Sequence, residues 1–175
     1  NGYVYNTLVH EVGHALGLGH GGPYNNGDNL GTFPDRQLGV YDSRLWSIMS
    51  YINANDTTAK FFGDYPVTGT AWGNLNSTTP MMLDILAIQR LYGGPGSGPL
   101  IGGGKIFGFN ANIGGDVGNY FDFRINQRPI VTIWAPGSGN TLDLSGFASD
   151  ATINLRPGTF SSAAGMVNNI AIALG

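Results

Sequence analysis

The chain has 175 residues, of which 42% are hydrophobic and 11% are charged, and its formal net charge is -3 at pH 7. This composition excludes a disordered chain and predicts one ordinary domain or two small lobes. The slightly acidic balance gives no basic field for phosphate groups, and no apolar run is long enough to span a bilayer, so neither nucleic acid nor a membrane is an expected partner.

The chain contains no cysteine. Disulfides and thiolate metal sites are therefore excluded, which leaves His, Asp, Glu and Tyr as the strong metal ligands. The compartment stays open on this ground, because some secreted proteins and many cytosolic proteins share the feature. The first residues lack the charged start, apolar stretch and cleavage site of a secretory signal.

A first helix is expected from Thr7 to about Leu18. Asn6 or Thr7 can serve as its N-cap, and Gly17 and Gly19 can end it. Apolar residues recur along this segment at helical spacing. They are Leu8, Val9, Val12, Ala15 and Leu16.

Residues 20–79 are rich in Gly, Asn, Asp and Pro and predict long ordered loops, interrupted by a short apolar segment at residues 45–51. A second helix is expected after the cap at residues 77–80, with Pro80 in its first turn and Gly93 at its end. Its apolar face is expected to pack in the core. That face consists of Met82, Ile85, Leu86, Ile88 and Leu91.

Beyond a glycine-rich segment at residues 93–104, six short stretches alternate in hydrophobicity or are rich in β-forming residues. They are residues 105–110, 120–125, 129–135, 141–147, 151–156 and 169–175. The expected fold class is α+β, with helices followed by a β-rich half that forms a sandwich or the start of a roll. The expected division is residues 1–94 and residues 95–175.

All three histidines of the chain lie in the stretch HEVGHALGLGH. On a helix, His10 and His14 project from one face a turn apart, so both imidazoles can reach one ion. Gly17 suits the positive φ that turns the chain back and brings His20 to the same ion. Three imidazoles leave one position of a zinc ion for water, and Glu11 can accept a proton from that water. The stretch predicts one catalytic zinc ion and amide hydrolysis.

The pattern His-Glu-x-x-His-x-x-Gly-x-x-His resembles the zinc motif of the metzincin metallopeptidases, and SIMSY resembles their methionine turn. The resemblance implies that Met49 forms an apolar floor under the histidines. It also implies that Tyr51 binds the resting metal and then donates a hydrogen bond to the developing oxyanion. Gly21 after the third histidine and Ser50 after the methionine are similar to the serralysin form and differ from the astacin form.

The resemblance to serralysins covers almost the whole chain. It implies that residues 1–94 are the lower part of a catalytic domain and that residues 95–175 belong to the serralysin C-terminal region. Serralysins commonly carry calcium-binding aspartates at three positions that differ here, and two other aspartates remain. The altered positions are Gly104, Ala135 and Asn140, and the remaining carboxylates are Asp122 and Asp143. Because calcium prefers carboxylates, no calcium ion is expected in this chain.

Two further parts are implied by the resemblance and do not occur in these 175 residues. They are an upper lobe that precedes the zinc helix, and calcium-binding glycine-rich repeats that follow the β-rich half. We therefore expect the chain to be a piece of a longer secreted protein, with the upper lobe in another part of the same molecule.

The expected function is that of a secreted, extracellular zinc endopeptidase that hydrolyses extended polypeptides. The alternative is a non-catalytic structural or binding module of a secreted repeat protein, whose zinc site only holds loops together. An open metal position beside Glu11 favours the enzyme, whereas a fourth permanent protein ligand favours the module.

Overall fold

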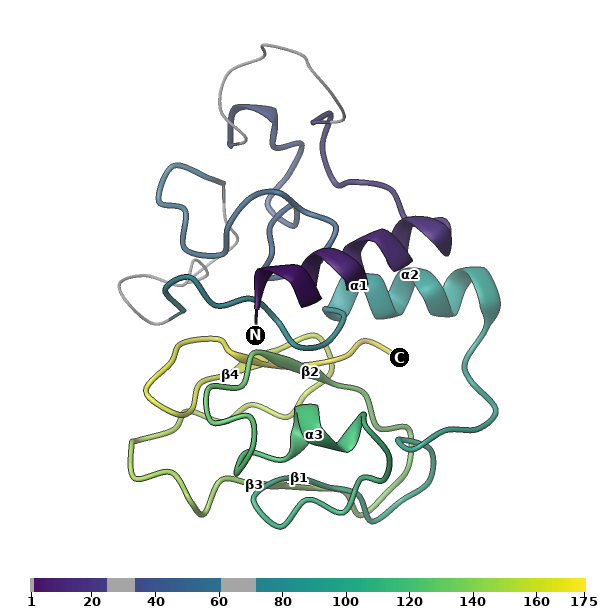
Figure 1. Cartoon of the computed structure of the whole chain (residues 1–175), viewed down its shortest axis with the longest axis vertical. Helices are drawn as coiled ribbons and strands as arrows, with labels where there is room; N and C mark the ends of the chain where they lie inside the picture. Colours follow the sequence, from purple (N-terminus) through teal and green to yellow (C-terminus); the bar gives the residue numbers. More distant parts are fainter. Residues whose placement is uncertain (1, 25–33, 61–71) are drawn as a thin grey trace.

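The computed structural model describes residues 2–24, 34–60 and 72–175. Two helices, α1 (Tyr3–Ala15) and α2 (Met82–Tyr92), lie above small sheets in Figure 1, and irregular segments cover the top. The fold is mixed α+β, as the sequence predicts. In the described ranges no helix combines the length and the apolar character needed to cross a membrane.

α1 begins at Tyr3 and not at Thr7, and its N-cap is Gly2 in an extended conformation. The predicted caps were wrong because both side chains are used elsewhere. The Thr7 hydroxyl donates to the Tyr3 carbonyl inside the helix, at 3.0 Å. Asn6 is buried and donates its amide to Ser77.

The apolar stripe of α1 faces outward. Val4, Leu8 and Val12 are 81%, 62% and 48% exposed. The buried side of the helix carries Asn6, His10 and Gly13. Helical periodicity therefore predicted the helix correctly, but the side that the molecule buries is the polar side with the first histidine.

α2 begins at Met82, so Pro80 lies before the helix and not in its first turn. The cap residue is Met81, whose N–H donates to the Asp84 carboxylate at 2.8 Å. Leu91, which was predicted on the packed face, is 57% exposed. The two threonines that precede Pro80 bond to a later strand segment and are therefore not available to cap α2.

The strands form two small sheets. One pairs β1 (Ile106–Gly108) with β3 (Thr141–Asp143) in parallel. The other has the order β2-β5-β4 and consists of β2 (Val131–Ile133), β5 (Ile170–Ile172) and β4 (Phe160–Ser161), with β2 parallel and β4 antiparallel to β5. Within the part of the chain that the structure describes, neither sheet closes into a roll.

Two of the six predicted strands are wrong. Residues 120–125 contain the end of a short helix, α3 (Gly118–Phe121), and then one isolated bridge at Asp122. Residues 151–156 also contribute only one isolated bridge, at Thr152. Aromatic and β-branched residues are typical of buried positions as well as of strands. In residues 120–125, Phe121 and Phe123 are buried although the segment does not form a paired strand.

The three-stranded sheet separates two hydrophobic clusters. Successive side chains of a strand point to opposite faces, so Ile130 packs with Met49 on one face and Val131 packs with Phe107 on the other. The first cluster joins the sheet to residues 45–54 and 72–82. Because the predicted units 1–94 and 95–175 share this cluster, their division remains a prediction.

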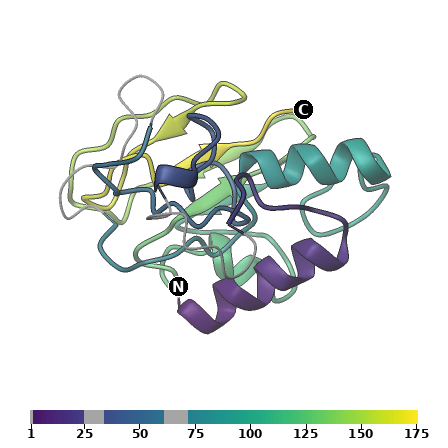
Figure 2. The same ribbon diagram turned by 90° about the horizontal axis from the view of Figure 1, so that it is seen from above.

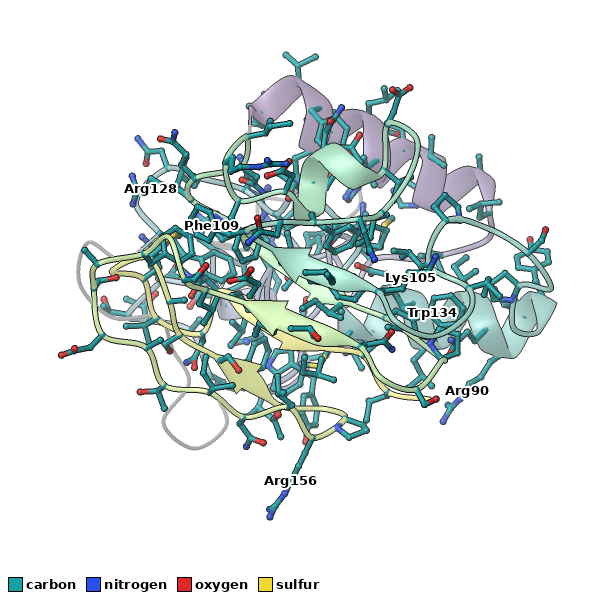
Figure 3. The ribbon with its side chains drawn as sticks, turned by 90° about the horizontal axis from the view of Figure 1, so that it is seen from below. Arg90, Lys105, Phe109, Arg128, Trp134 and Arg156 are labelled. Atoms are coloured by element: carbon teal, nitrogen blue, oxygen red, sulfur yellow. The ribbon has the colours of Figure 1, made fainter. Side chains whose placement is uncertain are left out.

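The two long helices lie at one end of the molecule when it is seen from above (Figure 2). Their C-terminal ends meet, since the Tyr92 hydroxyl donates to the Leu16 carbonyl at 3.0 Å. Seen from below, the basic side chains Arg90, Arg128 and Arg156 lie at separate edges of the molecule (Figure 3). These three cations therefore do not form one positive patch.

Gly108 ends β1 with a φ of 106°, and a Cβ atom there would collide with the backbone oxygen of Asp143 on β3. We expect Gly108→Ala to lower the free energy of unfolding by about 2–4 kcal/mol, because it strains the backbone and separates the paired strands. Urea unfolding measures the change. Gly114→Ala is the control, because a Cβ atom at Gly114 meets nothing within 4 Å. Equal stability of the two variants would contradict this account of β1.

Candidate metal centre and active site

α1 presents two histidines on its buried side. His10 and His14 are four residues apart, which on a helix places them on one face. Their ring centroids lie 4.7 Å apart with the planes at 90°. His10 is 7% exposed, so its ring belongs to the interior of the molecule.

The chain turns back just after α1, at Gly17. This residue has a φ of 91°, a conformation that favours glycine. The N–H of Leu18 donates to the Gly13 carbonyl at 3.0 Å, which closes the end of the helix. The reversal brings His20 back beside the helix, with its ring centroid 4.7 Å from that of His14.

The three imidazoles converge through one nitrogen each. The Nε2 atom of His20 lies 3.1 Å from Nε2 of His10 and 3.0 Å from Nε2 of His14. Among the described His, Cys, Asp and Glu residues, these three form the one group of three or more that could hold a metal ion.

The hydrogen bonds of the other ring nitrogens decide which nitrogens are free to bind a metal. Nδ1 of His10 lies 2.8 Å from the Ile48 carbonyl, and Nδ1 of His14 lies 2.9 Å from the Leu18 carbonyl. A carbonyl oxygen only accepts, so in a neutral ring both Nδ1 atoms carry the proton and both Nε2 atoms carry lone pairs. Lone pairs that face one another at this distance require a shared cation or a proton.

The residues present fit a divalent ion of the zinc type. Zinc–nitrogen bonds of about 2.0–2.1 Å in a tetrahedron separate the ligand nitrogens by about 3.3 Å, close to the two separations found here. Imidazole suits zinc, and a neutral histidine whose Nδ1–H bonds a carbonyl is the usual ligand form. The cluster could therefore hold one such ion.

Glu11 is the residue next to the first histidine and is exposed. It is not a member of the histidine cluster. It lines a pocket of about 450 Å³ together with His10 and Tyr51. A carboxylate in this place is accessible to water and to a substrate beside the cluster.

Tyr51 lies against the histidines. Its ring centroid is 4.7 Å from that of His20 and 5.6 Å from that of His10. The ring also stacks on Tyr24 at 4.9 Å, with an interplanar angle of 20°, and Tyr24 in turn lies 5.3 Å from His20. Tyr51 therefore belongs to a group of three mutually contacting rings, at the edge of the pocket that Glu11 lines.

Met49 lies beneath α1 and is 2% exposed. A Cβ atom at Gly13 would come within 2.6 Å of the Met49 sulfur, so the absence of a side chain at Gly13 lets the methionine approach the helix. Gly13 stands between the two helical histidines in the sequence. The methionine therefore packs against the segment of α1 that carries them.

Asp84 is a residue that the sequence interpretation missed. It is 3% exposed, and its carboxylate accepts hydrogen bonds from the Ser47 hydroxyl, the Ile48 N–H and the Met81 N–H at 2.6, 2.9 and 2.8 Å. Burial raises the pKa of Asp84, and these three donors limit the rise. The carboxylate thereby fixes Ile48, whose carbonyl accepts from His10. The sequence feature that could have identified Asp84 is that it is the one acidic residue in a helix that is apolar except for Gln89 and Arg90.

A second missed group lies behind Tyr51. The Tyr24 hydroxyl donates to the Asp42 carboxylate at 2.5 Å, and the Ser50 hydroxyl donates to the same oxygen at 2.8 Å. Burial, together with the nearby Asp42, raises the pKa of Tyr24 to about 12. The group holds the ring on which Tyr51 stacks, and loop composition alone gives no signal for it.

The positions considered for calcium are closed by hydrogen bonds. The Asn140 amide donates to the Ala135 and Gly137 carbonyls at 3.3 and 2.7 Å, and its oxygen accepts the Lys105 N–H. The two remaining carboxylates also have local partners, since Asp122 pairs with Arg124 and Asp143 accepts from Asn110 and Ser145.

Comparison with known proteins gives one consistent group. Residues 100–175 match the family model "Peptidase M10 serralysin C terminal". The chain is 36% identical over 173 residues to Metalloprotease AprA of Pseudomonas entomophila, and 38% identical over 175 residues to Serralysin C of Dickeya chrysanthemi. It is also 36% identical over 167 residues to Serralysin of Proteus mirabilis.

These matches cover 99%, 99% and 95% of the chain, and 33%, 33% and 31% of the three relatives. The chain therefore spans about a third of the length of the curated relatives it matches. With similarity from one end to the other and three histidines that converge on one point, the chain is a homologue of the serralysin metalloproteases.

Proposed function

We propose that the chain carries the zinc-binding part of a serralysin-like endopeptidase, with His10, His14 and His20 as the metal ligands. The observation that supports this most strongly is the convergence of three Nε2 atoms while the Nδ1 atoms of two rings bond to carbonyls. The names of the relatives support the same chemistry. The substrate class is an extended polypeptide.

A divalent ion at this site would supply Lewis acidity, which eases the deprotonation of water and polarises a carbonyl group. Glu11 is the general base: its carboxylate takes one proton from the attacking water as the new C–O bond forms. The same carboxylate then delivers the proton to the leaving nitrogen as the C–N bond breaks. Glu11 is the single glutamate of these 175 residues.

Tyr51 is the residue that assists at the carbonyl oxygen. In this proposal its phenol would be a further ligand of a bound ion in the resting protein, and with substrate present it would donate a hydrogen bond to the oxygen on which charge develops. A donor of this kind can contribute about 3–4 kcal/mol to the stabilisation of a transition state. Its place beside His10 and His20, at the edge of the Glu11 pocket, supports this role.

The alternative of a non-catalytic module has less support. A purely structural zinc site is closed by four protein ligands. Among the described His, Cys, Asp and Glu residues the cluster has three members, so the fourth protein ligand of this proposal would be Tyr51, which lines the same pocket as Glu11 and would be displaced by substrate. This arrangement favours a site that is open to a substrate.

Other parts of the molecule belong to the same proposal. The exposed stripe of Val4, Leu8 and Val12 on α1 suits a covering lobe from another part of the polypeptide, and such a lobe would form the second wall of the cleft. The match of residues 100–175 supports the start of a β-roll region. We place the whole protein outside the cell, in keeping with its resemblance to serralysins.

Loss of one histidine tests the metal site directly. The protein should bind one equivalent of zinc, and His14→Ala should weaken the affinity by more than about 100-fold, because even outer-shell partners of zinc ligands contribute 10–100-fold. Competition with a chromogenic chelator measures it. Asp150→Asn is the matched surface control, since Asp150 is exposed. The site is wrong if both variants bind zinc equally well.

Glu11→Gln separates the base from the metal ligands. The amide has the shape of the carboxylate but cannot take a proton, so hydrolysis of a fluorogenic peptide should fall by about 10²–10⁴-fold. Zinc content, measured on the same sample, should stay at one equivalent. Hydrolysis at the parental rate would remove Glu11 from the mechanism.

Asp84→Asn tests the support of His10. The amide leaves at least one of the three donors without its acceptor, so the free energy of unfolding should fall by about 1–3 kcal/mol. Zinc affinity should fall by about 10–100-fold, because Asp84 holds the residue whose carbonyl accepts from His10. Chemical unfolding and chelator competition measure the two changes. Asp150→Asn is the control, and unchanged zinc affinity in a destabilised Asp84→Asn would limit the role of Asp84 to folding.

A further inference from the structure

A second pocket adjoins the Glu11 pocket. It has a volume of about 380 Å³, which lies in the range of ligand sites. The two pockets share four lining residues, so they lie side by side and are separated by these side chains alone. The shared residues are Tyr3, Asn6, Arg44 and Asn53.

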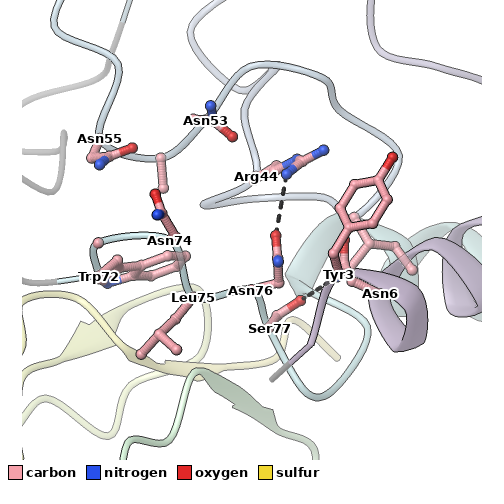
Figure 4. Close-up of a pocket in the computed structure, with 13 residues that line it drawn as sticks. Tyr3, Asn6, Arg44, Asn53, Asn55, Trp72, Asn74, Leu75, Asn76 and Ser77 are labelled. Atoms are coloured by element: carbon pink, nitrogen blue, oxygen red, sulfur yellow. Dashed lines mark hydrogen bonds between the residues drawn. The ribbon is translucent and has the colours of Figure 1, made fainter.

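The lining of this second pocket is polar but almost uncharged. Side-chain amides and hydroxyls supply most of its polar groups (Figure 4). They belong to Asn6, Asn53, Asn55, Asn74, Asn76, Ser77 and Tyr3. Among the described residues of the lining, Arg44 is the one charged residue and none carries a carboxylate. The amide groups can donate as well as accept, so the wall suits an anionic or polar group.

Arg44 is held rigidly at the boundary between the two pockets. Its backbone N–H donates to the Ile52 carbonyl at 2.8 Å, and its Nε donates to the Ser50 carbonyl at 3.2 Å. One terminal nitrogen donates to the Asn76 side chain at 3.1 Å (Figure 4). The guanidinium is therefore bonded to the residue before Tyr51, and the Arg44 backbone is bonded to the residue after it, so the position of Arg44 is linked to that of the proposed catalytic tyrosine.

Among the described residues, none supplies a counter-charge to Arg44. No carboxylate of the described residues lies within ion-pair distance of it, and its side-chain bonds go to a neutral carbonyl and a neutral amide. Burial lowers the pKa of Arg44, which indicates that the cation is partly desolvated. A partly buried cation without a partner binds a carboxylate more strongly than an exposed cation does.

We propose that this second pocket, named here the Arg44 pocket, binds a carboxylate of the polypeptide substrate next to the bond that is cut, and that Arg44 selects it. The inference rests on the proposed peptidase function and adds the class of substrate, which is a polypeptide with a carboxylate next to the bond that is cut. The Arg44 guanidinium can bind a carboxylate by donating two parallel N–H bonds to it. The amides of the pocket wall can donate to the remaining lone pairs of that carboxylate. The carboxylate comes from an Asp or Glu side chain or from the C-terminus of the substrate.

The test uses the intact protein with bound zinc and a set of fluorogenic peptides. The peptides carry Glu, Gln or Lys at each position around the cleaved bond and end in an amide, and a parallel set ends in a free carboxylate. At one position Glu should exceed Gln in kcat/KM by about 10–100-fold, the range of a charge-assisted hydrogen bond. A preference confined to the free-carboxylate set identifies the C-terminus as the source.

Two variants assign the preference to Arg44. Arg44→Gln should reduce the Glu-over-Gln ratio to below about threefold while the Gln peptide is still cut, and Arg44→Lys should retain part of it. Arg156→Gln is the control, since Arg156 is exposed and extends from the edge of the molecule (Figure 3). The proposal would be overturned if the parent protein cut Glu and Gln peptides equally and also cut amidated and free-carboxylate peptides equally. A carboxylate preference that is unchanged in Arg44→Gln would overturn it as well.

Binding gives a readout that does not depend on turnover. Fluorescence anisotropy with the Glu11→Gln protein should show tighter binding of the Glu peptide than of the Gln peptide, and the difference should disappear when Arg44→Gln is added. If no peptide is cut but this difference is found, the peptidase proposal fails and the Arg44 pocket stands. If peptides are cut and no difference is found, the Arg44 pocket fails and the peptidase proposal stands.

Discussion

Two backbone carbonyls control the metal centre. Ile48 O and Leu18 O accept the Nδ1 protons of His10 and His14, and this leaves the Nε2 lone pairs of both rings turned toward His20. Removal of either carbonyl would free its ring to rotate or to change tautomer. The centre is therefore built from backbone positions as much as from the histidines themselves.

Those carbonyls are positioned by distant parts of the chain. Ile48 is fixed by Asp84 at the start of α2, and the segment around it packs on the three-stranded sheet through the cluster that includes Ile130. The sheet is in turn covered on its other face by the second cluster. The β-rich half of the chain thus supports the histidines without contributing a side chain to them.

The same segment also links Arg44, the proposed substrate-binding residue, to Tyr51, the proposed catalytic residue. Ser50 accepts from Arg44 through its carbonyl, and its hydroxyl donates to Asp42. Tyr51 follows directly, and its ring contacts the rings of His20 and Tyr24. One short stretch after Met49 therefore connects the histidine cluster, the proposed oxyanion donor and the Arg44 pocket.

Local signals predicted some features well and others poorly. The spacing of His10 and His14 follows from helix geometry, and the turn at Gly17 follows from the conformations that glycine allows. The N-cap of α1 was wrong because Asn6 bonds to the distant Ser77 and Thr7 bonds within the helix, and the strands at residues 120–125 and 151–156 were wrong because each segment forms only one isolated bridge. Hydrogen bonds between distant residues leave no periodic signal.

The sequence by itself determined the helix with its two histidines, the glycine turn and the residue types that suit zinc, since each depends on neighbours within a few positions. Only the tertiary structure decided which side of α1 is buried, that Asp84 holds Ile48, and that Arg44 bonds to neutral oxygens of Ser50 and Asn76 next to Tyr51. The physical reason is that burial and pairing depend on which distant segments meet, and that depends on the packing of the whole chain.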